Sequence, residues 1–183
     1  MSFVNFGRDY DGARDGFVYM ISHDGPLAHE PADRMILARV PADRIADRSA
    51  YEFFVRRTED GGAVWTADVA RRGASFVHAG KCLRSSMVYS PALRRYLYWQ
   101  QLPNRAIADR GDTRFAGGFG IYDAPEPWGP WTTSYYTERW DVGPGEHAEF
   151  PTKWMGADGR TAWLVFSGDD CFSVRQARFT VAD

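Results

Sequence analysis

The chain has 183 residues, of which 44% are hydrophobic and 15% aromatic, and its formal net charge is −2. A chain of this length and composition can bury a substantial core, so we predict one folded domain and exclude disorder of the whole chain. The near-neutral charge argues against a nucleic-acid or anionic-membrane partner, because both usually select a clearly basic surface.

The cysteines, the apolar runs and the N-terminal sequence indicate the cellular compartment in which we expect the protein. Cys82 and Cys171 are far apart in the sequence and do not have the spacing of metal ligands, so the sequence indicates neither a disulfide framework nor a zinc site. A single disulfide between them is the alternative. No apolar run approaches the roughly eighteen residues of a membrane helix, and the N-terminus lacks the signal-peptide pattern. We expect a cytoplasmic protein from the sequence as written, and a secreted or periplasmic one if an upstream segment is missing.

Short apolar runs alternate with turn signals through the first part of the chain. The Asp/Gly cluster at 10–16 and the proline at position 41 separate the runs, which we predict to be strands at 2–9, 17–22, 35–40 and 51–55. Four short meandering strands have the size of one β-propeller blade.

The same pattern continues to the C-terminus. A second group of strands is predicted at 82–89, 95–99, 118–122 and 131–136, and a third at 149–155, 161–167 and 172–179. We therefore predict an all-β, propeller-like fold of about three four-stranded antiparallel blades, at 1–62, 63–140 and 141–183. It should have at least ten strands and no helix beyond about three turns, because no long 3.6-residue periodicity occurs. An immunoglobulin-like β-sandwich is the alternative.

The second group contains a corner, 119–131, which reads FGIYDAPEPWGPW. Three prolines in six residues forbid a helix here, and glycines on both sides of Phe119 give a thin, closely packed backbone. Aromatic content this high favours packing between sheets and would also suit a cleft in which aromatic faces stack on sugar rings.

Several segments together carry a family resemblance. They are NFGRDYDG at 5–12, ARVP at 38–41 with DRI at 43–45, WGPW at 128–131, KW at 153–154 and VFSG at 165–168. In this order they resemble a bacterial domain-of-unknown-function family that is similar to five-bladed β-propeller glycoside hydrolases of the arabinanase and xylosidase type, some members being endo-D-arabinanases. The resemblance implies a carbohydrate-active, glycoside hydrolase-like protein, a furanosidase or arabinanase relative acting on a polysaccharide.

The resemblance extends over nearly the whole chain but over only about three of the five blades. The essential aspartate that family members place on the first blade has no counterpart here. A non-catalytic carbohydrate-binding module and an incomplete propeller with a structural role are therefore the alternatives. Three blades leave two open sheet edges, so we expect self-association, or pairing of an edge with the N-terminal strand at 2–6.

Two carboxylates are the candidates for catalysis, because glycoside hydrolysis needs a pair flanking the scissile bond, and in a propeller such groups lie on the innermost strands. Glu149 opens the inner strand of the third group beside Phe150 and Pro151, where an apolar setting is expected to raise its pKa. Asp9 is the second candidate. It sits in an Asp/Gly-rich turn, where capping of the backbone is the alternative role.

Substrate binding is predicted for polar and aromatic residues on the same inner strands: Arg8, Arg84, Ser85, Ser86, Lys153 and Trp154. The arginines suit multidentate hydrogen bonds to a sugar, with an ion pair between blades as the alternative, and the tryptophan suits stacking. His147 with Glu146 and Glu149 forms a short cluster, but no further ligands are in view. We therefore predict no metal site and no cofactor.

Overall fold

The computed structural model describes residues 1–104, 106 and 116–180. Over these residues the chain forms thirteen β-strands, and its helices are 3₁₀ turns of three residues each. The all-β prediction, the number of strands and the expectation of no long helix are confirmed for this part of the chain. None of its helices has the length and apolar character needed to span a bilayer.

Three groups of strands follow one another along the chain. The first contains β1 (Ser2–Phe6), β2 (Phe17–His23), β3 (Ala32–Pro41), β4 (Glu52–Arg57), β5 (Ala63–Thr66) and β6 (Phe76–Cys82). The second contains β7 (Ser85–Ser90), β8 (Arg95–Pro103), β9 (Gly117–Ala124) and β10 (Thr132–Thr137). The third contains β11 (Ala148–Glu149), β12 (Thr161–Phe166) and β13 (Ser173–Arg178).

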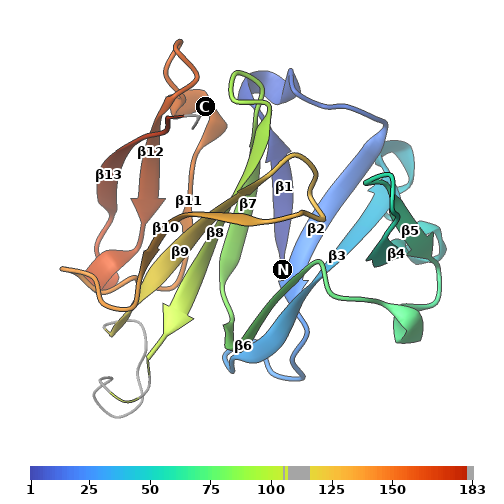
Figure 1. Ribbon diagram of the computed structural model, residues 1–183, viewed down its shortest axis with the longest axis horizontal. Coiled ribbons are helices and arrows are strands. Elements are labelled where there is room, and N and C mark those ends of the chain that lie inside the picture. The colour runs from blue at the N-terminus through green and yellow to red at the C-terminus, as the bar shows by residue number, and fades with distance from the viewer. Residues whose placement is uncertain (105, 107–115, 181–183) are drawn as a thin grey trace.

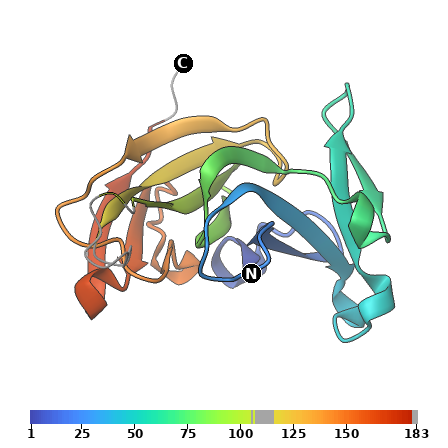
Figure 2. The same ribbon diagram turned by 90° about the horizontal axis from the view of Figure 1, so that it is seen from below.

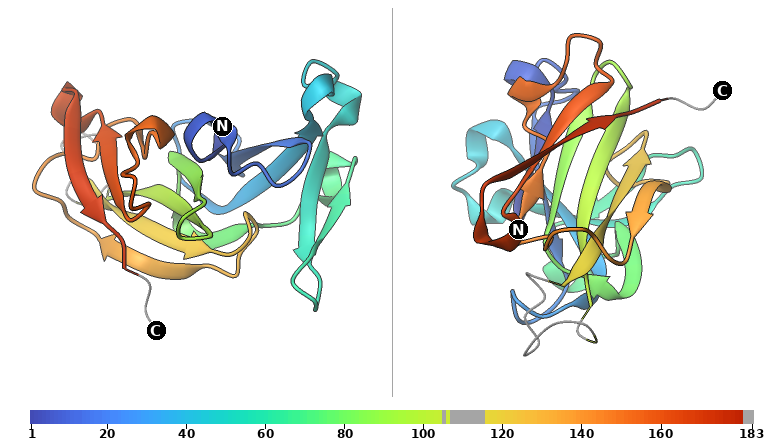
Figure 3. Two further views of the ribbon diagram at one scale, coloured as in Figure 1. Left: turned by 90° about the horizontal axis from the view of Figure 1, so that it is seen from above. Right: turned by 90° about the vertical axis from the view of Figure 1, so that its left-hand side faces the viewer.

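Short helical turns connect these strands at the rims. They are η1 (Arg8–Tyr10), η2 (Ala42–Arg44), η3 (Arg48–Ala50), η4 (Val69–Arg71), η6 (Thr152–Trp154) and η7 (Gly168–Asp170). The groups fan out around a common centre, as Figures 2 and 3 show from below and above. At this centre β1, β7 and β11 lie side by side (Figure 1). This is the arrangement of part of a β-propeller.

One strand pair departs from the predicted antiparallel meander. β1 and β7 pair in parallel, with Val4 opposite Met87 and Phe6 opposite Tyr89, and this pair joins the first two groups into one curled ten-stranded sheet. The reason is β6, which was not predicted as a strand. It pairs with β3 and returns the chain to the end of the sheet where β1 begins, so that the strand expected to begin at position 82 begins at Ser85.

The N-terminal strand does not cover an outer edge. β1 pairs with β2 on one side and with β7 on the other. Within the described residues, β13 pairs with β12 alone. Self-association through such an edge stays a prediction.

Two hydrophobic cores lie on opposite faces of the second group. Tyr98 belongs to the core shared with the first group, and Trp99 to the core shared with the third, because successive side chains of a strand point to opposite faces. Both residues are fully buried. Burial of each contributes about 2–3 kcal/mol to folding, so β8 helps to hold all three groups together.

The Pro/Gly corner fastens the second group to the first. Trp128 and Trp131 pack against the shared core, and their indole N–H groups donate to the carbonyls of Gly61 and Ser75 at 3.0 and 2.8 Å. The predicted close packing of the glycines is also seen. A side chain at Gly118 would collide with the backbone of Thr137 on the neighbouring strand β10.

A buried carboxylate fastens the loop after β2. Asp24 is 6% exposed and accepts hydrogen bonds from Arg34 of β3 at 2.6 Å and from Arg72, which follows η4, at 2.9 Å. Burial alone would raise the pKa of Asp24, but the hydrogen bonds from Arg72 and Arg34 outweigh it and hold the pKa below its ordinary value. The ionised carboxylate therefore stabilises the fold.

Candidate functional site

The predicted site residues divide between the two ends of the innermost strands. Arg84 and Ser85 lie where β7 begins, beside Ser2 at the beginning of β1. Asp9 and Trp154 lie at the other end, in η1 and η6, which pack beside each other. Six residues of extended chain span roughly 17–20 Å, so the two sets lie at opposite ends of β7.

A pocket of about 380 Å³ opens where β1 and β7 begin. Its polar lining includes Ser22, His23, Arg84, Glu146 and His147. The lining side chains come from all three groups, from the end of β2, the beginning of β7 and the segment before β11. The pocket is thus built by the convergence of the innermost strands.

Arg84 stands on the wall of this pocket between the second and third groups. Its guanidinium donates to Gln101 Oε1 at 3.3 Å and lies 3.8 Å from Glu146 Oε2. The side chain keeps 23% of its surface exposed. Both expectations for this residue therefore agree with its position, because it forms an ion pair between groups and still borders the pocket.

The two serines are both buried but differ in their partners. Ser85 lines the pocket, and its carbonyl accepts a hydrogen bond of 2.7 Å from the Ser2 hydroxyl. Ser86 is buried and points toward β11, where its hydroxyl donates to the Ala148 carbonyl at 2.6 Å. This bond positions the strand that carries Glu149.

Glu149 is half-exposed and is coupled to His147. The distance from His147 Nε2 to Glu149 Oε2 is 3.9 Å, and the nearby His147 side chain holds the pKa of Glu149 below its ordinary value. The expected rise in pKa is therefore wrong. Phe150, which was to supply the apolar setting, points to the opposite face of the chain and is buried in the core.

The other end of the strands carries the remaining candidates. Asp9 has a left-handed backbone (φ 55°) and is exposed, as are Lys153 and Trp154. Tyr10 is half-exposed in the same turn, with its hydroxyl 3.5 Å from Asn5 Oδ1. The side chain of Arg8 lies outside the described part of the structure.

Neither of the two predicted catalytic carboxylates lines the pocket at Arg84. The bond from Ser86 to Ala148 sets Glu149 beside the first residues of β7, whereas the register of β1 with β7 carries Asp9 past the end of that strand.

Three ionisable residues of this pocket were not predicted as a site. Glu146 and His147 were considered only as part of a metal cluster, and His23 was assigned to a loop. The Nδ1 atom of His23 is buried without a hydrogen-bond partner among the described residues, and burial lowers the pKa of its ring. A histidine directly after an apolar strand was the available signal. The described residues contain no group of three His, Cys, Asp or Glu side chains suited to a metal ion.

Comparison with known proteins extends this description. No protein-family model and no curated protein sequence matches the chain, so the resemblance to a domain-of-unknown-function family finds no support there. Solved structures do match. The exo-β-1,3-galactanase Pc1,3Gal43A from Phanerochaete chrysosporium, in a variant with β-1,3-galactotriose, aligns with a TM-score of 0.53 at 9% identity over 88% of this chain and 33% of its own.

Two further neighbours are of the same kind. A Bifidobacterium bifidum protein named as an exo-β-1,3-galactanase aligns with a TM-score of 0.50 at 12% identity, over 92% of this chain and 48% of its own. The GH43 β-1,3-galactosidase BT0265 aligns at 0.49, with 14% identity over 85% and 28%.

These neighbours are five-bladed β-propeller glycoside hydrolases, and the chain spans a third to a half of the length of the galactanases. At such low identity the likeness shows the fold alone. The fold is that of a partial β-propeller.

Proposed function

We propose that this chain is a carbohydrate-active domain that binds a saccharide in the pocket where β1 and β7 begin. The observation that carries the proposal is the convergence of three propeller groups on one polar pocket with Arg84, Glu146 and His147 on its walls. Sugar hydroxyls both donate and accept hydrogen bonds. A guanidinium beside a carboxylate offers both kinds of partner within one wall.

The neighbours guide the choice of sugar. Pc1,3Gal43A is named as an exo-β-1,3-galactanase and is seen with galactose and with β-1,3-galactotriose. The sequence resemblance instead suggests an arabinan. We propose a β-1,3-galactan as the first glycan to test and an arabinan as the second, with Lys153 and Trp154 binding more distant residues of the same polysaccharide.

Glycoside hydrolysis is the second candidate function, because the galactanases with a similar fold are glycoside hydrolases. A carboxylate with a lowered pKa is ionised at neutral pH and suits the role of base or nucleophile, whereas the general acid must hold its proton. We propose Glu149 for that ionised role and keep Asp9 as a candidate for substrate contact at the far end.

Titration calorimetry with β-1,3-galactobiose, β-1,3-galactotriose and arabinotriose tests the binding proposal. Arg84→Ala should weaken binding at least about tenfold, because hydrogen bonds from a charged group contribute about 1.5–3 kcal/mol. Arg57→Ala, which removes an exposed arginine from β4 in the first group, is the matched control and should leave affinity unchanged. No binding of any of these glycans, or equal binding by both variants, would refute the proposed site.

Release of reducing sugar tests hydrolysis separately. Glu149→Gln should lower turnover at least about a hundredfold while leaving binding largely intact. Trp154→Ala should weaken binding of longer oligosaccharides by removing a stacking face. If the parent protein binds but releases no sugar, the carbohydrate-binding module is the correct alternative.

A further inference from the structure

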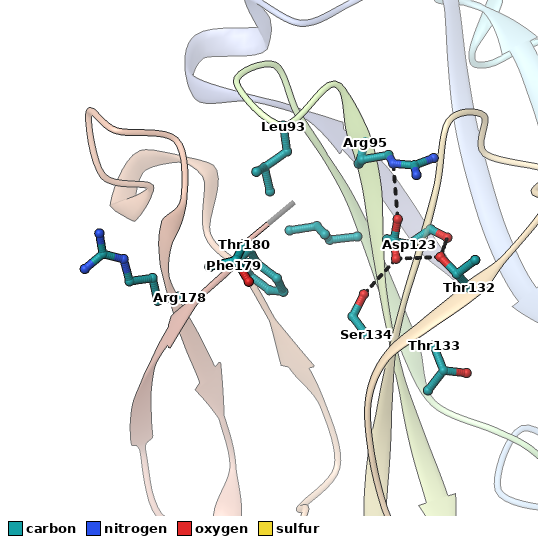
Figure 4. A pocket seen from close by; sticks show the side chains of 10 residues that line it. Leu93, Arg95, Asp123, Thr132, Thr133, Ser134, Arg178, Phe179 and Thr180 are labelled. Carbon is teal, nitrogen blue, oxygen red and sulfur yellow. Dashed lines mark hydrogen bonds and ion pairs between the residues drawn. The ribbon is translucent and has the colours of Figure 1, made fainter. Parts of the chain in front are cut away.

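A second cleft lies away from the innermost strands, between the second and third groups (Figure 4). It has a volume of about 500 Å³, within the range of small-molecule sites in proteins. Its walls are the beginnings of β8 and β10, the end of β9, and the residues at the end of β13. It shares no lining residue with the pocket at Arg84.

The centre of one wall is a carboxylate held by three donors. Asp123 Oδ1 accepts from the hydroxyls of Thr132 at 2.7 Å and Ser134 at 2.8 Å, and Oδ2 lies 3.2 Å from Arg95 Nε. Figure 4 shows these side chains converging on Asp123. Since both hydroxyl protons point at Asp123, the hydroxyl oxygens present lone pairs to the cleft.

This arrangement selects against an anion. Asp123 neutralises Arg95, and the hydroxyl oxygens act as acceptors, so a phosphate or carboxylate would meet negative charge and lone pairs. The guanidinium of Arg178 is directed away from Asp123 (Figure 4). Hydroxyl groups of a neutral ligand can donate to these acceptors and accept from the remaining N–H groups of Arg95.

The cleft also has an apolar lining beside Asp123. Leu93, Leu97 and Phe179 line it, and all three belong to, or pack against, the core between the second and third groups. Tyr135 follows on β10 with 46% of its surface exposed and its ring 5.2 Å from that of Phe119. A ligand with one apolar face and a rim of hydroxyl groups fits such a cleft, and a sugar ring has this form.

We infer that the cleft at Asp123 is a second carbohydrate site that takes a neutral saccharide ring. Its location on the outer side of the second group, apart from the innermost strands, would let it hold a polysaccharide away from the pocket at Arg84. The inference stands on the contacts of Asp123 and is independent of the proposed function at that pocket.

Chemical-shift mapping by ¹H–¹⁵N NMR tests the inference on the whole chain. Methyl β-galactopyranoside and methyl α-arabinofuranoside are the neutral probes, and glucuronate is the anionic one. The amides of Asp123, Thr132 and Ser134 should shift with at least one neutral probe, with affinity at least fivefold higher than for glucuronate. An absence of shifts at these amides up to saturating probe, or preferential binding of glucuronate, overturns the inference.

A double variant then locates the residues that contact the ligand. Thr132→Val with Ser134→Ala removes both hydroxyls at nearly constant shape and should weaken binding at least fivefold. Ser173→Ala is the control, because this surface hydroxyl bonds the Cys171 carbonyl and does not line the cleft, and it should bind within twofold of the parent. Arg84→Ala should leave this affinity unchanged, which separates the two sites. Equal affinities for the double variant and the parent would contradict the inference even if shifts occur.

Discussion

Replacement of Ser86 by Ala tests how the third group is held against the second. The Ser86 hydroxyl donates to the Ala148 carbonyl at 2.6 Å between two buried residues. Loss of a buried hydrogen bond that leaves its acceptor without that donor destabilises a protein by about 1–2 kcal/mol. For a chain of this size this corresponds to a fall in Tm of roughly 2–8 °C.

Thermal unfolding followed by circular dichroism, with urea unfolding at 25 °C, measures the effect. Ser173→Ala is the matched control, since that hydroxyl bonds only a carbonyl two residues away at the surface, at 3.3 Å. Its effect should stay within about 0.5 kcal/mol.

A Ser86→Ala variant as stable as the control would refute this account of the interface. The same variant separates positioning from direct sugar contact. If Ser86 contacts the sugar, its removal weakens glycan binding while leaving Tm unchanged. If it positions β11, stability falls first, and the pKa of Glu149 moves with it, which a pH titration of the Glu149 side chain by NMR would detect.

Three further predictions concern stability and reactivity. The pKa of Asp24 is lower in the folded state than in the unfolded chain, where it is about 3.9, so the ionised carboxylate stabilises the fold above that pH. This stabilisation is lost as the pH falls through the folded-state pKa. Asp24→Asn should therefore remove this acid dependence from the urea midpoint. Gly118→Ala should destabilise by more than about 2 kcal/mol in urea unfolding, because backbone of the next strand blocks the new methyl group, whereas Gly16→Ala meets no atom within 4 Å. Burial raises the pKa of Cys82 to about 11, so in a thiol titration at pH 8 exposed Cys171 should react quickly and Cys82 only on unfolding; equal rates would contradict the buried position.

The strands of the fold were predictable where proline, glycine or aspartate residues mark their ends. Pro41, the Asp/Gly clusters and the Pro-rich corner all fall at strand ends or turns, because the chemistry that forbids a strand acts within a few residues. β6 was missed since its sequence, FVHAGKC, mixes exposed and buried positions without regular alternation. Its pairing with β3 is a contact between distant segments, which no short window contains.

The sequence predicted which strands carry the candidate site better than it predicted the surroundings of each side chain. Arg84 and Ser85, chosen for their position on the innermost strands, lie on the wall of a pocket, and their role in substrate binding stays a prediction. For Glu149, however, the apolar neighbour Phe150 pointed to the other face, and the decisive contact came from His147, two residues earlier on the same face. Alternation along an extended chain means that the adjacent residue is a poor guide to a side chain's environment, and the residue two positions away is a better one.

The burial of β7 explains why functional groups collect at the ends of the innermost strands. Met87 and Tyr89 face the core shared with the first group, while Val88 faces the core shared with the third, so the middle of this strand offers no side chain to a ligand. Polar groups reach solvent at Arg84, just before the strand begins, or on neighbouring strands that are covered on one face. Glu149 on β11 is such a neighbour. A ligand bound at this centre must therefore contact strand ends and the flanking strand, which is why the pocket draws its polar lining from all three groups.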